Sequence, residues 1–281
     1  MSWKHSVLAA LLALAAAVAP ARAQRVELDL IKQPVIEERL GTLSRKLAER
    51  RATLEKFFEQ AGCTADSLAS QRVRGSREPN VICTLKGQDP EAGVIVVGGH
   101  FDLITAGMGA VDDWSGAVLL PSLYESLKSR PRRHDFVFVA FAAEEMGLDG
   151  SGEYVNALTK PQRAVIRAMI NLECLGLASP KIWGSHADPR LLEAYARIAS
   201  LLHIQPGSVN IDQVGDDDSH SFRDAKIPTL TIHSITQETF PILHTSRDNI
   251  GAIDVDQYYA AYRLTATLLA YVDSFGAGLR P

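Results

Sequence analysis

The chain has 281 residues, of which 46% are hydrophobic and 22% are charged, so it is long and apolar enough for one large domain with a substantial core. Its formal net charge is −4, from 29 basic and 33 acidic residues. An acidic chain lacks the positive footprint that phosphate backbones require, so we expect no nucleic acid among its partners.

Residues 1–23 have the layout of a secretory signal peptide. Lys4 supplies the positive start, residues 7–18 form an apolar stretch, and Ala21-Arg22-Ala23 matches the usual cleavage pattern. The apolar stretch is short for a bilayer span, which weighs against the alternative of a membrane anchor. We predict cleavage after Ala23 and a periplasmic or secreted protein with no stable membrane association. Loss of two basic residues leaves 27 basic against 33 acidic residues, a net charge of −6.

Helical spacing extends over residues 34–61, where Ile36, Leu40, Leu43 and Leu47 recur on one face, and Gly62 follows as a plausible end. We expect the helical segment 24–79 to pack on the rest of a single domain, residues 24–281. Residues 71–80 are basic and irregular, and we interpret them as a solvated loop.

The chain has three cysteines, too few for a disulfide framework. Cys63 and Cys83 could form one bridge in an oxidising compartment, and the sequence leaves this open. Cys174 would then remain, and its ordinary role is that of a small buried side chain.

Short apolar runs alternate with helical segments through the rest of the chain. The runs predict buried strands at 81–85, 94–97, 136–141, 169–172 and 229–232, and the other segments predict helices near 114–129, 188–203 and 254–274. This alternation predicts an α/β fold with a mixed, mostly parallel central sheet covered by helices on both faces, a three-layer α/β/α sandwich.

Side chains that can bind metal follow three of the predicted strands directly. His100 comes after the second strand, Glu144 and Glu145 after the third, and Glu173 after the fourth. Ligands bind at the carboxyl ends of the strands in open α/β sheets, so we expect these side chains at one edge. Nitrogen and oxygen donors in this mixture suit zinc or a similar transition metal better than magnesium or calcium.

The chain carries, in order, the motifs H-x-D at 100–102, D-D-x-S-G at 112–116, E-E-x-G at 144–147, N-L-E at 171–173 and H-T-x-x-D at 244–248. Each motif alone is weak, but the ordered set resembles the aminopeptidase Y and bacterial leucyl aminopeptidase family of co-catalytic zinc peptidases over residues 80–275. The resemblance implies a zinc-exopeptidase-like fold and two zinc ions per chain.

The resemblance also implies a ligand set. Asp112 would bridge the two metals, His100 and Glu173 would complete one site, and Glu145 and His244 would complete the other.

Two further residues receive catalytic roles by the same resemblance. Glu144 would be the general base, and Asp102 would accept a hydrogen bond from the far nitrogen of His100 and so orient the ring. The peptide bond between Asp112 and Asp113 is expected to be cis.

The chain departs from the family pattern at several positions. Glu173 stands where many relatives have aspartate, and Leu243 stands where some have a tyrosine thought to steady the transition state. Asp218 lies in a segment similar to the family's S-D-x-x-x-F, and we expect a supporting role for it at most.

The other histidines and large aromatic residues carry less information. We interpret His134 and His186 as loop residues, His233 as a pocket residue with a structural role, and His220 as the weakest candidate. Candidates for an apolar wall of the pocket are Trp114, Trp183, Phe222 and Phe240, although core packing is the ordinary role of each.

The sequence thus predicts an exported di-zinc metallopeptidase, an aminopeptidase acting on peptides with a free N-terminus, because an acidic pocket attracts the substrate α-amino group. One alternative is a glutaminyl cyclase-like acyltransferase with a single zinc, and another is a carboxypeptidase of the same family. A catalytically silent binding module is a further alternative, but such a protein should have lost ligands or the base, and every matched position is filled.

Overall fold

A computed structural model describes residues 28–212 and 215–275, so the predicted signal peptide lies outside the described residues. Its centre is a seven-stranded sheet of order β1-β2-β4-β3-β5-β7-β6. The strands are β1 (Leu68–Gln71), β2 (Asn80–Leu85), β3 (Val94–His100), β4 (Asp135–Phe141), β5 (Ile166–Glu173), β6 (Lys181–Ile182) and β7 (Thr229–His233). Strands β4, β3, β5 and β7 are parallel, and the outer strands pair antiparallel, which confirms a mixed sheet with a parallel centre.

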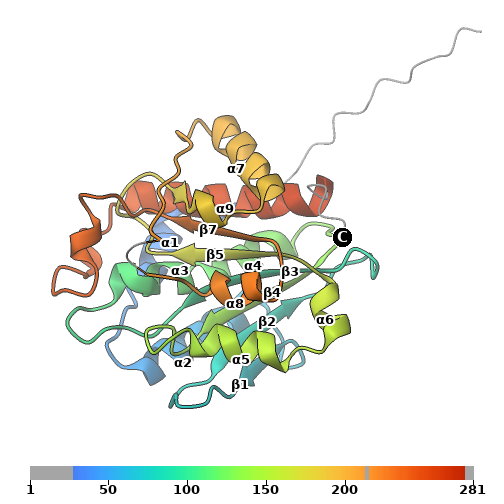
Figure 1. Cartoon of the computed structure of the whole chain (residues 1–281), viewed down its shortest axis with the longest axis horizontal. Helices are drawn as coiled ribbons and strands as arrows, with labels where there is room; N and C mark the ends of the chain where they lie inside the picture. Colours follow the sequence, from blue (N-terminus) through green and yellow to red (C-terminus); the bar gives the residue numbers. More distant parts are fainter. Residues whose placement is uncertain (1–27, 213–214, 276–281) are drawn as a thin grey trace, which may run out of the picture.

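Helices cover both faces of this sheet (Figure 1). They are α1 (Gln33–Leu40), α2 (Leu47–Ala61), α3 (Ser115–Ala117), α4 (Leu120–Lys128), α5 (Asp149–Ala157), α6 (Lys160–Ala164), α7 (Pro189–Leu201), α8 (Ser219–Asp224) and α9 (Val255–Phe275). Helices α2, α4 and α9 pack over the larger of two hydrophobic clusters, and α5 and α8 pack over the smaller one. The predicted three-layer α/β/α sandwich is therefore confirmed.

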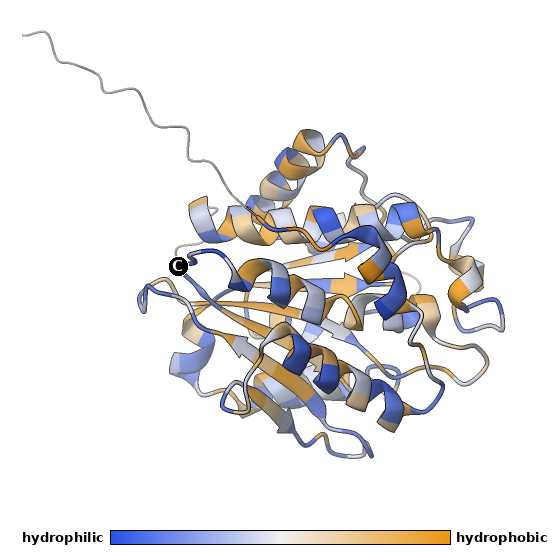
Figure 2. Ribbon diagram, turned by 180° about the vertical axis from the view of Figure 1, so that it is seen from behind, coloured by the Kyte–Doolittle hydropathy of each residue, from blue (hydrophilic) through white to orange (hydrophobic). Residues whose placement is uncertain are grey.

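The distribution of apolar residues explains this layering. Seen from behind, the central strands are largely hydrophobic along their length, whereas the surrounding helices alternate between apolar and polar faces (Figure 2). Strand β3, for example, has six buried residues among its seven. Strands buried on both faces read as continuous apolar runs, which is why the five core strands could be predicted.

The prediction of one helix over residues 34–61 is wrong in its middle. The helix ends after Leu40, where the Gly41 amide donates to Glu37 O at 3.0 Å, and α2 begins only at Leu47. The Ser44 hydroxyl accepts from the Lys46 amide at 3.1 Å, a local bond that competes with helix continuation. The predicted end is confirmed, because Gly62 adopts φ +99°, a left-handed conformation that suits glycine.

Several short elements were not predicted. Strands β1 and β6 and helices α5, α6 and α8 are short or have weak apolar periodicity, so the 3.6-residue and 2-residue patterns do not stand out. Helix α6, for instance, has no buried residue and begins at a capping box formed by Thr159 and Gln162.

The N-terminal helices are fastened to the sheet. A disulfide joins Cys63, just after α2, to Cys83 in β2, so the possibility left open by the sequence is realised. Phe58 of α2 packs with its ring centroid 6.4 Å from that of Phe138 in β4. The segment before residue 80 thereby shares the larger core with the sheet.

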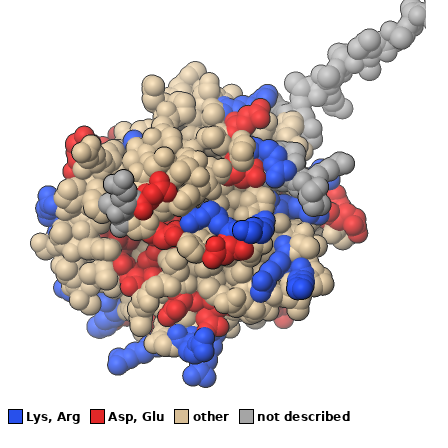
Figure 3. All heavy atoms as spheres, viewed as in Figure 1, with Lys and Arg blue, Asp and Glu red and all other residues tan. Residues whose placement is uncertain are grey.

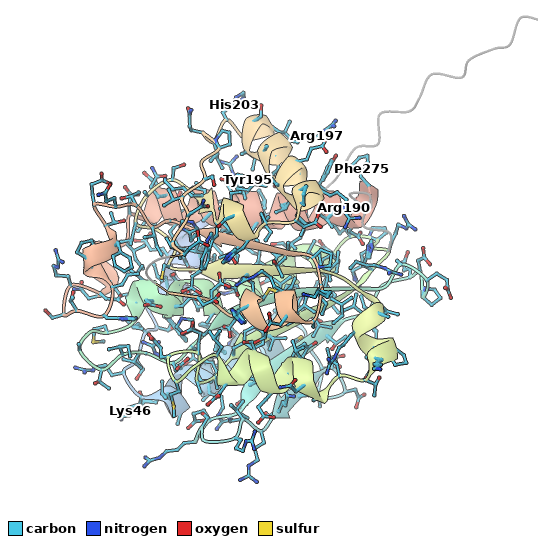
Figure 4. All side chains as sticks on the ribbon, viewed as in Figure 1. Lys46, Arg190, Tyr195, Arg197, His203 and Phe275 are labelled. Atoms are coloured by element: carbon cyan, nitrogen blue, oxygen red, sulfur yellow. A yellow bond between two sulfur atoms is a disulfide. The ribbon has the colours of Figure 1, made fainter. Side chains whose placement is uncertain are left out.

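Helix α7 lies beyond α9 at the top of the molecule (Figure 4). Tyr195 of α7 is buried and its hydroxyl donates to Pro180 O at 2.9 Å. Arg197 lies over the ring of Tyr271 in α9, 5.7 Å from its centroid. These contacts anchor the covering helix over the β6–β7 side of the sheet. Among residues 28–212 and 215–275, no helix combines the length and apolarity that a bilayer crossing needs.

Candidate metal centre

The parallel strands bring the predicted residues to one edge of the sheet, the left edge in Figure 1. His100 is the last residue of β3, Glu173 is the last residue of β5, and Glu144 and Glu145 follow the end of β4 by three and four residues. Neighbouring parallel strands end together because β3 pairs in register with both β4 and β5. Residues more than 40 positions apart in the chain therefore meet.

Asp112 occupies the centre of the cluster. Its Oδ1 lies 3.1 Å from His100 Nε2, and its Oδ2 lies 3.0 Å from His244 Nε2. Each histidine faces a second carboxylate, since Glu173 Oε1 is 3.6 Å from His100 Nε2 and Glu145 Oε2 is 3.2 Å from His244 Nε2. All five predicted metal ligands are thus brought together, in two half-sites that share Asp112.

Asp102 lies beside His100 and also contacts the backbone of Glu144 and Glu145. Its Oδ1 lies 3.3 Å from His100 Nδ1, but this ring nitrogen has no hydrogen-bond partner among the described residues, so the expected hydrogen bond stays a prediction. Its two oxygens also accept hydrogen bonds from the backbone amides of Glu144 at 3.0 Å and Glu145 at 3.1 Å. The Glu144 side chain faces the same space, with Oε2 3.8 Å from His100 Nε2.

Asp113 has a role that the sequence did not indicate. The peptide bond before it is cis, as expected. Asp113 accepts from the amides of His100 at 3.2 Å, Gly116 at 3.0 Å and Cys174 at 3.1 Å. A Cβ on Gly116 would lie 2.5 Å from the Asp113 carboxylate, so this approach requires glycine. Asp113 therefore ties the ends of β3 and β5 together.

Asp248 was in a recognised motif but had no assigned role. Its Oδ1 accepts from the amides of Ala110 at 2.8 Å and Val111 at 2.7 Å, and so fixes the turn that leads into Asp112. The spacing of the motif was the available signal, because Asp248 follows His244 by four residues and its side chain reaches the neighbouring loop.

Cys174 lies closer to the site than an ordinary core residue. It is buried, adopts φ +49°, and its Sγ lies 3.2 Å from Glu173 Oε1. Its thiol lines the same cavity as Glu173.

The electrostatics of the protein without cations show how strongly the carboxylates interact. Burial raises the pKa of Glu144 to about 10 and that of Glu145 to about 7, with the charge of Asp112 adding to both shifts. Burial by itself would raise the pKa of Asp112, but hydrogen bonds with His100 and His244 hold this pKa below its usual value. The hydrogen bond to Asp112 raises the pKa of His244 to about 9. Without cations this cluster retains protons, and cations would replace them.

The donor set fits zinc. Asp112, Glu145 and His244 offer ligand atoms within 4.8 Å of one another, and so do His100 and Glu173 in a group whose third member, Asp113, already accepts from backbone amides. Glu145 Oε1 is buried and has no hydrogen-bond partner among the described residues, as expected of a ligand atom held ready. Imidazole nitrogens with carboxylate oxygens are donors that zinc prefers.

A cavity of about 490 Å³ opens onto the cluster. Its apolar side is formed by Ile211, Ile235, Phe240 and Leu243, so Phe240 is the one aromatic candidate that the structure places in the wall. The other three candidates, Trp114, Trp183 and Phe222, are fully buried in the core and do not line it. Leu243, which stands where some relatives have a tyrosine, also lines the cavity, but its side chain has no hydroxyl that could take the tyrosine's role.

The remaining predicted residues lie around this centre. Asp218 is fully buried before α8, and burial raises its pKa to about 8. His233 is buried and structural, since its Nδ1 accepts from the Ile235 amide at 3.1 Å. His134 pairs with Asp273, and His186 and His220 pair with surface aspartates, so none of these three is in the cluster.

The fold and the cluster together define a metal-binding α/β/α protein with its site at the carboxyl edge of a mixed sheet. A sequence model described as peptidase family M28 matches residues 80–269. The chain belongs to this peptidase family, and the resemblance read from the motifs is confirmed.

Individual relatives agree with this assignment. A probable leucine aminopeptidase 2 from Aspergillus fumigatus is 32% identical over 186 residues, which cover 65% of this chain and 34% of that protein. A zinc aminopeptidase from Bacillus subtilis superposes with a TM-score of 0.63 at 25% identity, over 69% of this chain and 49% of that chain. A glutaminyl cyclase from an Acidobacteriales bacterium shares the fold, with a TM-score of 0.75 at 16% identity over 92% of this chain and 100% of that chain.

The chain spans 34–42% of the length of the first curated relatives that it matches. The activities and substrates of these relatives therefore support a proposal about this chain and are not assigned to it directly.

Proposed function

We propose that this protein is an exported di-zinc aminopeptidase. The observation that carries the proposal is the position of Asp112, whose two oxygens face two histidines 3.1 Å and 3.0 Å away, each histidine accompanied by another carboxylate. One carboxylate shared between two half-sites is what a pair of co-catalytic metals needs. Export is supported by residues 1–23 and by the Cys63–Cys83 disulfide, which is typical of an oxidising compartment.

His100, Asp112 and Glu173 would hold one zinc ion, and Asp112, Glu145 and His244 the other. Bound zinc supplies Lewis acidity, which polarises a substrate carbonyl and acidifies water.

Glu144 is the group that moves the proton. Its carboxylate faces the cluster, with Oε2 3.8 Å from His100 Nε2, and it is not one of the five proposed ligands although it lies within reach of His100 and Glu145. As general base it takes a proton from the attacking water at Oε2 and returns it to the leaving amine. Asp102 keeps Glu144 in place, because its carboxylate accepts hydrogen bonds from the backbone amides of Glu144 and Glu145.

The charge distribution favours a substrate with a free amino terminus. Acidic side chains gather left of centre on the face drawn in Figure 3, and basic side chains lie mainly to the right. At the opposite edge, basic residues line a groove: Lys160, Arg163, Arg167, Arg190 and Lys226. A negative pocket attracts an ammonium group, and the apolar wall at Phe240 leaves room for an apolar side chain.

A glutaminyl cyclase-like acyltransferase is the second candidate. The specific observation in its favour is length, because the chain covers all of a solved glutaminyl cyclase but about half of the Bacillus subtilis aminopeptidase. The half-site made by His100 and Glu173 beside Asp112 supports a second metal and hence hydrolysis.

The first experiment separates these reactions. We would measure zinc per chain, release of p-nitroaniline from aminoacyl p-nitroanilides, and cyclisation of a glutaminyl peptide, each with and without a chelator. Two zinc ions per chain and chelator-sensitive release of amino acids support the aminopeptidase. One zinc ion with cyclisation alone would replace it by the cyclase.

Substitution of the base gives the first prediction. Glu144→Gln keeps the shape of the side chain but cannot accept the proton, so kcat should fall by roughly 10²–10⁴-fold while zinc content stays unchanged. Glu145→Gln is the matched comparison, because the neighbouring residue is a proposed ligand and its substitution should lower zinc content. Turnover by Glu144→Gln close to that of the unaltered protein would remove Glu144 from the base role.

A further inference from the structure

Arg50 is the only arginine or lysine that is fully buried among the described residues. It lies one turn into α2, whose first flanking residue, Lys46, is labelled in Figure 4 at the lower edge of the molecule. On the inner face of α2 it aligns with Leu54, Phe58 and Ala61, all of them buried. A charged residue in an apolar helical stripe is costly unless its donors are satisfied.

The Arg50 guanidinium donates to five backbone carbonyls. Nε donates to Ser44 O at 2.6 Å, and Nη1 donates to Phe101 O at 3.0 Å and Asp102 O at 3.3 Å. Nη2 donates to Gly109 O at 3.0 Å and also to Met108 O. These bonds use the full set of donors that a rigid planar guanidinium offers.

Four of these acceptors are the two ends of one loop. Residues 101–109 leave β3 directly after His100 and return just before the turn that carries Asp112. Arg50 gathers Phe101 and Asp102 at the start of the loop and Met108 and Gly109 at its end. Carbonyl groups that point at one spot repel each other, so this convergence needs a cation at its centre.

The same loop end is held from the other side. Asp248 accepts from the amides of Ala110 and Val111, and its backbone carbonyl accepts from the Met108 amide at 2.8 Å. Arg50 thus binds the carbonyls of the loop and Asp248 binds its amides. Together they fix the backbone that aims Asp102 at the glutamate pair and Asp112 at both histidines.

We propose that Arg50 is a positioning residue of the metal centre, which closes loop 101–109 so that Asp102 and Asp112 are in place before metal binds. This inference rests on the proposed zinc site. It gives α2, which precedes the family match at residues 80–269, a role in positioning the metal ligands in addition to covering the sheet.

The test compares Arg50→Lys and Arg50→Gln with Arg39→Gln. Arg39 is a matched control, because it also lies in the N-terminal segment, lies over a ring (Phe57, 5.5 Å) and donates to Ser122 and Glu125 at 2.7 Å, yet it does not touch the loop. Zinc affinity is measured by competition with a chromogenic chelator, and urea unfolding reports stability separately. We expect both Arg50 variants to bind zinc 10–100-fold more weakly, as when outer partners of metal ligands are lost, and Arg39→Gln to bind like the unaltered protein.

Hydrogen exchange supplies a second readout, which does not depend on zinc binding. In the metal-free, unaltered protein the amides of Met108, Ala110 and Val111 should be protected, and in Arg50→Lys their exchange should rise at least about tenfold while β2 and β4 stay protected. If Arg50→Gln does not fold, Arg50→Lys and this measurement decide. Unprotected loop amides in the metal-free protein, or zinc binding by a folded Arg50 variant at unchanged affinity, would overturn the proposal. Absence of zinc binding by the unaltered protein would instead overturn the metal site itself.

Discussion

Asp112 presents one carboxylate oxygen to each of two histidines that lie 144 residues apart in the chain, and its neighbour Asp113 accepts from three backbone amides and from the Ser115 hydroxyl. Two adjacent aspartates therefore have different partners. Sequence motifs identified the pair, but only the folded backbone distinguishes a residue facing the site from one that holds the strand ends.

Loss of His244 should separate the two half-sites. The His244 side chain is 54% exposed, so His244→Ala removes a ligand without opening the core. We expect zinc content to fall from two ions to one and the activity to fall with it, because the site shared with Glu145 loses its only imidazole. Zinc is counted by atomic absorption after dialysis.

His203→Ala is the control for this change. His203 is exposed beyond the end of α7 at the top of Figure 4, remote from the cluster. Its substitution should leave zinc content unchanged. Two zinc ions retained by His244→Ala would show that the second half-site is wrongly assigned.

At the scale of elements, His100, Glu145 and Glu173 are placed by the ends of β3, β4 and β5, whereas Asp112 and His244 come from the segments between β3 and α3 and between β7 and α9. Strand ends were predictable, because apolar runs followed by His100, Glu144 or Glu173 are visible in the sequence. The supporting contacts were not predictable, since Arg50, Asp102 and Asp248 act through backbone groups far away in the chain. For Arg50, the available signal was a charge on the apolar face of a helix.

Helix α9 carries a carboxylate, that of Asp273, which binds the backbone amides just before β4. Asp273 is buried and accepts from the amides of Arg133 and His134 at 2.9 Å each and from His134 Nδ1 at 3.1 Å. Burial opposes ionisation, yet these hydrogen bonds hold the pKa of Asp273 below its usual value. The pKa is lower in the folded than in the unfolded chain, so ionised Asp273 stabilises the fold above pH ~4 and this stability is lost as the pH falls through the folded value.

Asp273→Asn should therefore lower the free energy of unfolding at pH 7 by on the order of 1–3 kcal/mol, and the difference from the unaltered protein should shrink below about pH 4. Urea unfolding at pH 7 and pH 3 measures it. Asp256→Asn, an exposed change near the start of the same helix, should have little effect. A loss that is the same at both pH values would contradict the role of the charge.

At the scale of the whole molecule, the acidic cluster lies at the carboxyl ends of the parallel strands and the basic groove at the opposite edge of the sheet, near the start of β5. Clustered carboxylates destabilise the metal-free fold, because burial and mutual repulsion raise the pKa values of Glu144 and Glu145. Zinc bound only by the folded chain adds stability by mass action.

Removal of zinc should consequently lower the melting temperature. With zinc at about a thousand times its dissociation constant, the added stability is about 4 kcal/mol, which corresponds to a shift on the order of 10 °C for a chain of this size. Calorimetry with and without a chelator, followed by addition of zinc, measures the shift and its reversal. An unchanged melting temperature would mean that the folded protein does not bind zinc tightly.

The sequence alone determined the α/β class, five core strands, the ordered ligand motifs and the family, because apolar periodicity and residue spacing are local properties of the chain. Tertiary structure alone decided that Asp113 binds the amides at the ends of β3 and β5, that Phe240 rather than Trp114 reaches the cavity, and that Arg50 binds both ends of loop 101–109. These contacts depend on which distant backbone groups the fold brings together. The sequence shows that a residue has a hydrogen-bond donor, but it does not show which acceptor will lie next to it.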